Sequence, residues 1–337
     1  MNDTAKGQTR AYWLRILAAT LVFIAFVAAI NVAAHGAFLR PGNVVTVLRQ
    51  ITYNFILGIG ETFVIITAGI DLSIGSLVSL CGVSMALIAN ALHLTGFPLI
   101  AVTLLAGIAI GAIAGYVNAL PVVKLNLPPF ITTLAMMQVA VGISYILSSG
   151  RPVALNSPDF QNTGYGSFLG GLTGALHLPS LPIPVIWMLI VGIFFSTLLT
   201  RTRFGRYVLA IGGNEEASRL AGVNVARIKT FVYVISGVCA AIVGFLYMAL
   251  FSSGSPQTGT GNEMLQAIAA VVVGGTSLMG GRGTIVGTFF GALLIGSLYN
   301  AMNLLNIDSY LQLVVLGAVI LLAVILDELR KRYLSRT

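Results

Sequence analysis

The chain has 337 residues, of which 57% are apolar and only 8% are charged. A soluble chain carries about 25% charged residues, so a soluble globular protein is excluded because these charges cannot cover its surface. The two cysteines, Cys81 and Cys239, lie within apolar runs, which also excludes a disulfide framework and a CxxC-type metal site. The composition therefore predicts a polytopic membrane protein.

The predicted spans are continuous apolar runs of about 20 residues, the length at which a helix crosses the hydrocarbon core. The alternating pattern of an outer-membrane barrel is absent. About ten runs follow one another along the chain: 13–34, 44–68, 72–92, 97–117, 128–148, 183–200, 229–252, 263–281, 284–303 and 309–327. The sequence predicts an all-α bundle of about ten transmembrane helices. No loop is long enough for a separate catalytic domain, so residues 1–337 are expected to form a single transmembrane domain.

The lysines and arginines predict the orientation of these helices, because short cytoplasmic loops are enriched in them. With the N-terminus in the cytoplasm and ten spans, Arg40, Arg49 and Arg151 lie at the outer side, and the other fifteen of the 18 lie at the cytoplasmic side. Both termini are predicted to be cytoplasmic, and the first run is expected to remain as a helix rather than be cleaved as a signal peptide. The net charge of +8 then faces anionic lipid and not nucleic acid.

Two halves of the chain, about 44–148 and 229–327, share a weak internal similarity. Each has a glycine-broken apolar block followed by a helix rich in small residues. Because five spans separate them, the halves are predicted to be inverted repeats, an arrangement typical of transporters. The glycines are spaced four residues apart in both helices: Gly107, Gly111 and Gly115, then Gly283, Gly287 and Gly291. This spacing predicts close helix packing, either within one subunit or between subunits.

The motifs of catalysis are absent from the sequence. We find no GxxxxGKS/T loop for ATP, no HExxH and no GxSxG. The histidines His35, His93 and His177 fall near predicted outer ends of spans, where a histidine is usually an interfacial residue. We therefore expect no metal site and no enzymatic activity in this chain.

Two carboxylates lie among the apolar runs: Glu61 within the second run and Asp71 in the connection that follows it. A carboxylate at membrane depth costs at least about 2.5 kcal/mol, so each is either functional or a buried group paired with a neighbour such as Arg49. One hypothesis is a secondary transporter that couples to an ion through Glu61 and Asp71. Four uncharged polar residues are further candidates for a translocation path: Ser73, Asn118, Gln138 and Asn300.

A basic, polar segment at 201–229 is predicted to lie in the cytoplasm. Gly212 and Gly213 end the preceding helix, and Asn214 is a good N-cap. A short helix is expected over the following residues, ending at a glycine: Glu215, Glu216, Ala217, Ser218, Arg219, Leu220, Ala221 and Gly222. It is either an amphipathic loop held to lipid or an element that docks on a cytosolic partner.

Three passages resemble the membrane permeases of bacterial ABC importers for monosaccharides, in the ribose-type, binding-protein-dependent branch (CUT2). "GIDLSIGS" (Gly69–Ser76) is similar to the GIDLSVGS block of that family. "AIGGNEEASRLAGV" (Ala210–Val223) is similar to its cytoplasmic coupling loop, and "GGTSLMGGRGTIVGTFFGALL" (Gly274–Leu294) to a block near its end. The resemblance covers about residues 44–327. Glu61 departs from the family pattern, in which an uncharged residue is more common.

The resemblance implies a set of partners and a division of labour. A second permease copy, identical or related, would form the path with this chain. Two cytosolic ATPase subunits would bind ATP and Mg²⁺, so that this chain needs no cofactor, and Asn214–Gly222 would be the coupling helix that docks on them. A soluble sugar-binding protein outside the inner membrane would supply the cargo. Ribose, a related sugar and the furanosyl signalling molecule autoinducer-2 remain alternative substrates.

Overall fold

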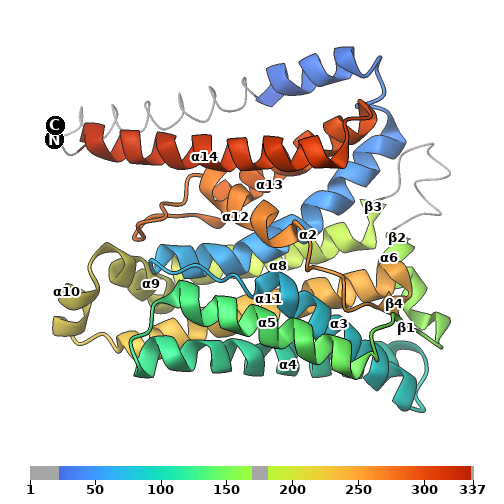
Figure 1. Ribbon diagram of the computed structural model, residues 1–337, viewed down its shortest axis with the longest axis horizontal. Coiled ribbons are helices and arrows are strands. Elements are labelled where there is room, and N and C mark those ends of the chain that lie inside the picture. Colours follow the sequence, from blue (N-terminus) through green and yellow to red (C-terminus); the bar gives the residue numbers. More distant parts are fainter. Residues whose placement is uncertain (1–22, 169–180, 335–337) are drawn as a thin grey trace.

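The computed structural model describes residues 23–168 and 181–334 of the chain. Over these residues it is a bundle of helices with four two-residue strands (Figure 1). The first part of run 13–34, the basic residues Lys6, Arg10, Arg15 and Arg336, and His177 lie outside the described residues. The result agrees with the predicted all-α, polytopic helical bundle.

Each of the ten predicted runs contains a helix in the described part of the chain. The first run contains a helix over Phe23–Ala33. The other nine contain α2 (Pro41–Ile66), α3 (Ile74–Ala91), α4 (Gly96–Lys124), α5 (Pro129–Leu147), α8 (Ile183–Arg201), α11 (Val225–Phe251), α12 (Glu263–Val273), α13 (Ile285–Leu304) and α14 (Ser309–Leu334). Between α8 and α11 lie two shorter helices, α9 (Arg203–Gly213) and α10 (Glu215–Leu220).

Six of these helices are long and apolar enough to cross a membrane: α3, α4, α5, α8, α11 and α13. The helix at Phe23–Ala33, α12 and the Ser309–Ile325 part of α14 are apolar but shorter. Helix α2 is long enough, but Arg49, Asn54 and Glu61 reduce its apolar character. It is buried continuously from Ile51 to Ile66, and a helix enclosed by other helices does not need to be apolar on every face.

The predicted run 263–281 is only partly helical, which corrects the sequence-based span. Helix α12 ends at Val273, and Gly275 has φ +87°, a conformation that favours glycine and cannot continue a helix. The remaining residues, 274–284, form a connection to α13. The glycine-rich stretch that was predicted to extend the span is therefore a loop. The prediction failed because hydropathy alone does not detect the end of a helix.

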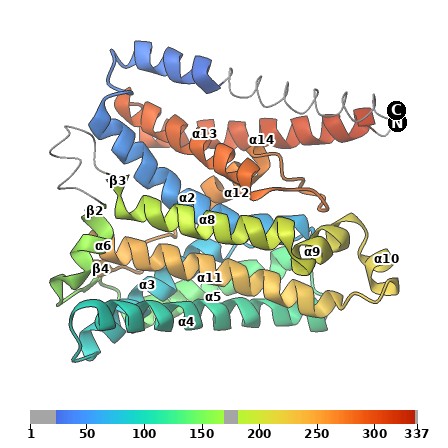
Figure 2. The ribbon, with the colours of Figure 1, turned by 180° about the vertical axis from the view of Figure 1, so that it is seen from behind.

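The helices are arranged in three layers in both views of the ribbon (Figure 1, Figure 2). Helices α12, α13 and α14 form one outer layer, and α3, α4, α5 and α11 form the other. Helices α2 and α8 lie between them, and α2 contacts α11, α13 and α12. The buried core runs along α2, α3 and α11, which are the most enclosed of the long helices.

Both glycine stripes pack within the chain. A Cβ atom on Gly111 of α4 would overlap the carbonyl oxygen of Gly237 on α11, and one on Gly237 would overlap that of Gly111. Likewise, a Cβ atom on Gly291 of α13 would overlap the carbonyl oxygen of Ala270 on α12. Of the two predicted roles for the stripes, the structure shows close packing of neighbouring helices in one subunit.

The two ends of the bundle differ. Helices α9 and α10 lie at one end, and the strands lie at the opposite end (Figure 1). Strand β1 (Val153–Ala154) pairs antiparallel with β4 (Ser253–Gly254), and β2 (Ser167–Phe168) with β3 (Leu181–Pro182). The connection between β1 and β2 contains a 3-10 turn at Pro158–Phe160 and the short helix α6 (Gln161–Tyr165).

A carboxylate fixes this connection to the start of α4. Asp159 Oδ2 accepts a hydrogen bond from the backbone N–H of Gly96 at 2.7 Å and one from the hydroxyl of Ser157 at 2.8 Å. These hydrogen bonds, first that of Gly96, hold the pKa of the half-buried Asp159 carboxyl below its usual range.

Replacement of Gly111 by alanine is expected to lower the stability of the purified protein. The added methyl group would force α4 away from α11, and overpacking of this kind costs about 1–3 kcal/mol. The apparent melting temperature in detergent should therefore fall. Gly317→Ala is the matched control, because a Cβ atom there meets nothing within 4 Å. Where no clash arises, alanine stabilises a helix relative to glycine by about 1 kcal/mol, so Gly317→Ala should not lower the melting temperature. Equal melting temperatures for the two variants would therefore contradict the packing role of Gly111.

Candidate functional site

A buried polar cluster lies where the chain passes from α2 to α3. The connection places Asp71 inside the bundle, with none of its surface exposed. Its Oδ1 atom accepts hydrogen bonds from the backbone N–H of Ser73 at 2.9 Å, the Ser73 hydroxyl at 2.5 Å and the Asn118 amide at 3.3 Å. Its Oδ2 atom accepts one from the Ser236 hydroxyl at 2.6 Å. Four donors therefore surround one carboxylate.

Glu61 lies next to this cluster on α2 and is also fully buried. Its Oε1 atom accepts a hydrogen bond from the backbone N–H of Asp71 at 3.1 Å, and its Oε2 atom has no hydrogen-bond partner. The pairing with Arg49 that the sequence suggested is wrong. Arg49 instead donates to the carbonyl oxygen of Tyr165 at 3.3 Å, near the opposite end of the bundle.

The cluster joins four helices through hydrogen bonds. Ser73 precedes α3, Asn118 is on α4 and Ser236 is on α11, while Glu61 belongs to α2. Since Asp71 accepts hydrogen bonds with both oxygens, its four donors compensate for the water that burial removes. We interpret the cluster as a set of hydrogen bonds that joins the non-helical connection between α2 and α3 to α4 and α11.

The structure brings together four of the six predicted path residues and separates the other two. Glu61, Asp71, Ser73 and Asn118 meet in the cluster. Asn300 of α13 instead exchanges hydrogen bonds of 2.8 and 2.9 Å with Asn43 near the start of α2. Gln138 lies on α5 with an exposed side chain.

Two residues of α11 that were not among the predicted candidates lie at the cluster: Ser236, which donates to Asp71, and Tyr233, which lies beside Gly69. The Tyr233 side chain is buried, and its hydroxyl lies 2.8 Å from where a Cβ atom on Gly69 would be. Both residues lie in an apolar run far from Asp71 in the sequence, and Ser236 follows Asp71 by 165 residues. A hydroxyl group within an apolar run could have indicated a buried polar contact, but the sequence does not specify which residue is its partner.

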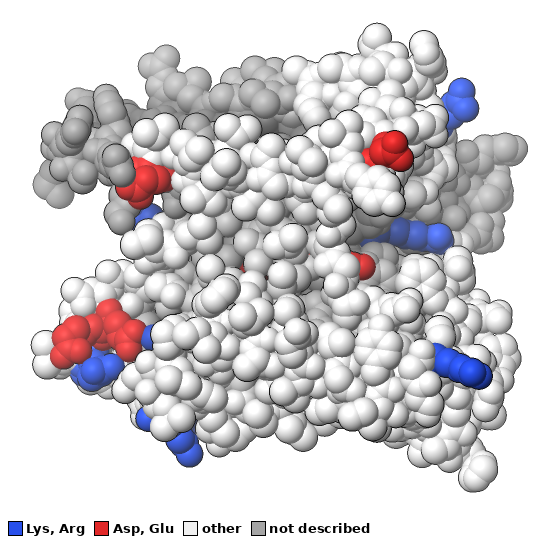
Figure 3. Space-filling view, viewed as in Figure 1, with Lys and Arg blue, Asp and Glu red and all other residues white. Residues whose placement is uncertain are grey.

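A cavity of about 240 Å³ opens beside the cluster, between the start of α3, the middle of α5 and the segment 255–262 that precedes α12. Figure 3 shows that this face of the molecule is hollowed between the layers that contain α12 and α5. Its lining is Leu72, Gly75, Ser76, Met137, Gln138, Val141, Gly259, Thr260, Gly261 and Met264. None of these residues carries a charge. The glycines expose backbone groups, and Gln138 and Thr260 add an amide and a hydroxyl.

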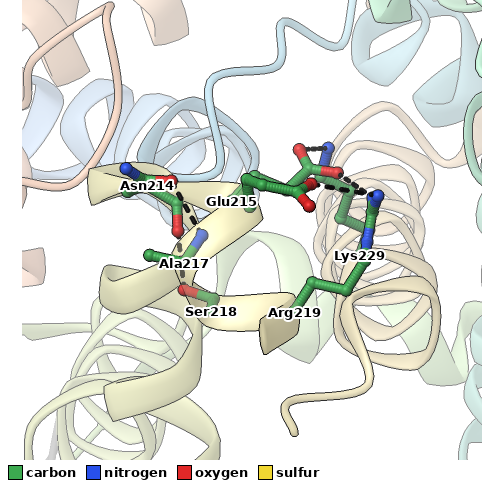
Figure 4. Close-up of polar contacts among 7 residues, drawn as sticks. Asn214, Glu215, Ala217, Ser218, Arg219 and Lys229 are labelled. Carbon is green, nitrogen blue, oxygen red and sulfur yellow. Dashed lines mark hydrogen bonds and ion pairs between the residues drawn. The ribbon is translucent and has the colours of Figure 1, made fainter. Parts of the chain in front are cut away.

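The predicted short helix of segment 201–229 is present as α10. The side chain of Asn214 accepts a hydrogen bond from the backbone N–H of Ala217 at 2.9 Å (Figure 4). The helix ends at Leu220, and Gly222 follows with φ +83°. Thus the local capping rules place this helix correctly to within one residue.

Ion pairs form within α10 and between α10 and the start of α11 (Figure 4). Lys229 Nζ lies 2.6 Å from Glu215 Oε2, while Arg219 lies 3.2 Å from Glu215 and 3.3 Å from Glu216. The arginine pairs are mostly exposed and add little stability. Leu220 at the end of the helix is 82% exposed and apolar. The helix therefore presents charged groups and one apolar side chain outward, and Figure 3 shows acidic and basic residues gathered at this end.

Comparison with known proteins assigns the chain to a family. The family described as "Branched-chain amino acid transport system / permease component" matches residues 43–324. The chain is 42% identical to the ribose import permease protein of Escherichia coli K12 over 334 residues, which is 97% of this chain and 98% of the relative. It is 36% identical to the D-allose transport system permease protein of the same organism, over 90% of each chain.

A third relative, the L-arabinose transport system permease protein of Escherichia coli K12, is 40% identical over 81% of this chain and 78% of its own length. No solved structure matches the chain. These relatives are transport permeases and not enzymes. The chain is a multi-pass membrane protein that belongs to this family of transport-system permease components.

Proposed function

We propose that the chain is the membrane-spanning permease subunit of an ABC importer that moves a ribose-like pentose or a related monosaccharide across the bacterial inner membrane. The resemblance of the three passages and the ribose, allose and arabinose permeases among the relatives support this proposal. The observation that carries it is α10, a capped helix that exposes Glu216 and Leu220 at one end of the bundle. Such a helix fits docking on a cytosolic subunit.

The proposed assembly has two copies of a permease, two ATPase subunits that bind ATP and Mg²⁺, and an extracytoplasmic sugar-binding protein. Helix α10 then faces the cytoplasm, as do both termini, and the strand end faces outward. The positions of the basic residues support this orientation: Arg203, Arg206 and Arg219 belong to α9 and α10, whereas Arg40 and Arg151 flank elements at the strand end.

The lining of the cavity carries no charged side chain, with Glu263 beside Gly261 as the acidic group near its edge, and this lining favours a neutral cargo. A sugar offers hydroxyl groups that both donate and accept hydrogen bonds, and Gln138, Thr260 and backbone groups can meet them. A branched-chain amino acid, named in the description of the family, carries two charges, and burial of a charge without a partner is costly. We therefore assign the cavity to the sugar path. Gln138 is exposed on the open side of this cavity, where a second permease copy would complete the path.

The alternative is an ion-coupled transporter that uses Glu61 and Asp71. Asp71 is already surrounded by four donors, so the cluster has a structural explanation that needs no transported ion. Nothing in the comparisons supports ion coupling.

Glu216→Arg is expected to remove the ATPase subunits from the permease purified from its own membranes. The change reverses a charge on the face of α10 and places a second arginine beside Arg219. The amount of copurified ATPase should therefore fall by at least about tenfold, which corresponds to about 1.4 kcal/mol. Asp308→Arg, at another exposed acid in the connection between α13 and α14, is the matched control and should retain the ATPase.

A second variant separates loss of docking from loss of the helix. Leu220→Ala removes an exposed apolar contact while alanine keeps the helix, so it should also weaken copurification. If the wild-type chain purifies from several detergents without any ATPase, the importer proposal fails.

Gln138→Ala is expected to lower the uptake of sugar by reconstituted vesicles. The loss of one hydrogen bond to a neutral hydroxyl, about 0.5–1.5 kcal/mol, should reduce kcat/KM about two- to tenfold. Val139→Ala changes the next residue of α5, which does not line the cavity, and should leave uptake unchanged. Equal effects of both variants, or uptake of leucine in place of sugar, would contradict the assignment of the cavity.

Glu61→Gln is expected to leave ATP-driven uptake within about twofold of wild type. The amide oxygen of glutamine can accept the same hydrogen bond from the backbone N–H of Asp71, and the other carboxylate oxygen has no partner to lose. Uptake should not respond to an ion gradient in either protein. Accumulation driven by a gradient without ATP, and abolished by this substitution, would favour the ion-coupled alternative.

A further inference from the structure

At Gly212, the last turn of α9 lies against backbone atoms at the end of α2. A Cβ atom on Gly212 would overlap the carbonyl oxygen of Ile66 and crowd the backbone nitrogen of Gly281. The N–H of Gly281 in turn donates a hydrogen bond of 2.9 Å to the carbonyl oxygen of Ile66. Three segments far apart in the sequence therefore meet at one carbonyl group, which we call the glycine junction: Ile66–Ala68, Gly212 and Gly280–Gly281.

Two of the three segments of this junction contain residues with a positive φ. Gly280 and Gly281 have φ +85° and +76°, and Ala68 has φ +58°, which a residue with a side chain seldom adopts. A Cβ atom on Gly280 would lie 3.0 Å from the carbonyl oxygen of Ile66 and 3.1 Å from the nitrogen of Ala68. Both ribbon views show the connection between α12 and α13 reaching toward α9 (Figure 1, Figure 2).

The hydrogen bond of Gly281 also closes the end of α2. The last carbonyl groups of a helix have no partner within the helix, and in a membrane protein each must find one elsewhere. Gly69 N–H and Ala68 N–H satisfy the carbonyl oxygens of Val64 and Ile65, and Gly281 satisfies that of Ile66. The end of α2 therefore depends on the connection between α12 and α13.

On one side the junction is continuous with α10. Asn214 is at once the C-cap of α9 and the N-cap of α10, so no flexible linker separates the two helices. A displacement of α10 must therefore rotate or shift the last turn of α9, which includes Gly212. Because the contact at Gly212 is between backbone atoms, no side-chain rotamer can absorb that displacement.

On the other side the junction is continuous with the polar cluster. Asp71 follows Ala68 by three residues, and its carboxylate is held by groups on α4 and α11. The same connection leads to Leu72, Gly75 and Ser76, which line the cavity. A shift of Ile66 therefore moves a segment that borders the cavity.

We propose that the glycine junction transmits the movement of α10 to the connection between α2 and α3, with Gly212 and Gly281 as positioning residues. This inference rests on the proposed function, because it takes the movement of α10 to come from ATPase subunits. It adds a route by which that movement reaches the cavity: from α10 through Asn214 and Gly212 to Ile66, and from there to the segment that carries Asp71.

The test compares two adjacent glycines in the reconstituted complex of permease, ATPase and sugar-binding protein. Gly212→Ala inserts a methyl group into the junction, whereas Gly213→Ala inserts one where nothing lies within 4 Å. The measured quantity is the sugar transported per ATP hydrolysed. We expect this ratio to fall at least about fivefold in Gly212→Ala and to stay at the wild-type value in Gly213→Ala.

The ratio distinguishes transmission from a structural defect. Both rates are measured on complexes purified through a tag on the permease, so a variant that only assembles poorly loses transport and ATP hydrolysis together and its ratio stays constant. An unchanged ratio in Gly212→Ala, or an equal fall in both variants, overturns the inference.

Hydrogen exchange on the wild-type complex provides a test that needs no folded variant. The amide of Gly281 is expected to exchange at different rates in the ATP-free complex and in the complex trapped with ATP and vanadate, because its acceptor on α2 moves. The amide of Gly237, within α11, is the control. Equal exchange of Gly281 in the two states overturns the inference even where the ATPase copurifies with the permease. Absence of the ATPase would instead reject the proposed function and this inference with it.

Discussion

The need to satisfy every backbone polar group away from water governs this structure. A continuous helix meets that need by itself, but α2 stops inside the bundle and α3 starts after a non-helical connection. The groups left over are met by partners from the rest of the fold: Gly281 caps α2, and the Asp71 carboxylate ties the connection to α4 and α11. The cavity borders this interruption, with Leu72, Gly75 and Ser76 among its lining residues.

Small residues serve two different purposes in the same chain. Between α4 and α11, Gly111 and Gly237 allow the helix backbones to approach and so contribute packing in a medium that offers little hydrophobic driving force. At the end of α9, Gly212 allows the same close approach between segments that are expected to move. In both places the neighbour is a carbonyl oxygen, so a methyl group is tolerated only if the backbone shifts. Glycine content alone does not distinguish these roles, but their places in the fold do.

Features encoded locally could be predicted from the sequence, and features that depend on tertiary contacts could not. The all-α bundle and the helix that begins after Asn214 follow from hydropathy and capping, which act over a few residues. The early end of α12 was missed because the segment from Gly274 to Gly281 carries no charge and was read as part of the same run, although glycine can end a helix. The pairing of Asp71 with Ser236 was missed because 165 residues separate them, and Arg49 was assigned to the wrong partner for the same reason. Resemblance to known permeases supplied the function, which the residues alone left open.

The long separation of these partners has a consequence for how the protein is made. During synthesis, α2 and the connection that carries Asp71 enter the membrane before Ser236, Gly281 or Asn300 exists. The partner of Asn43, Asn300, is translated 257 residues later, and Ser236, a partner of Asp71, is translated 165 residues later. Until α11 and the connection after α12 have been translated, the nascent chain holds a helix end and a carboxylate without their final partners. The early part of the chain therefore completes these contacts only after α11 and α13 have been translated.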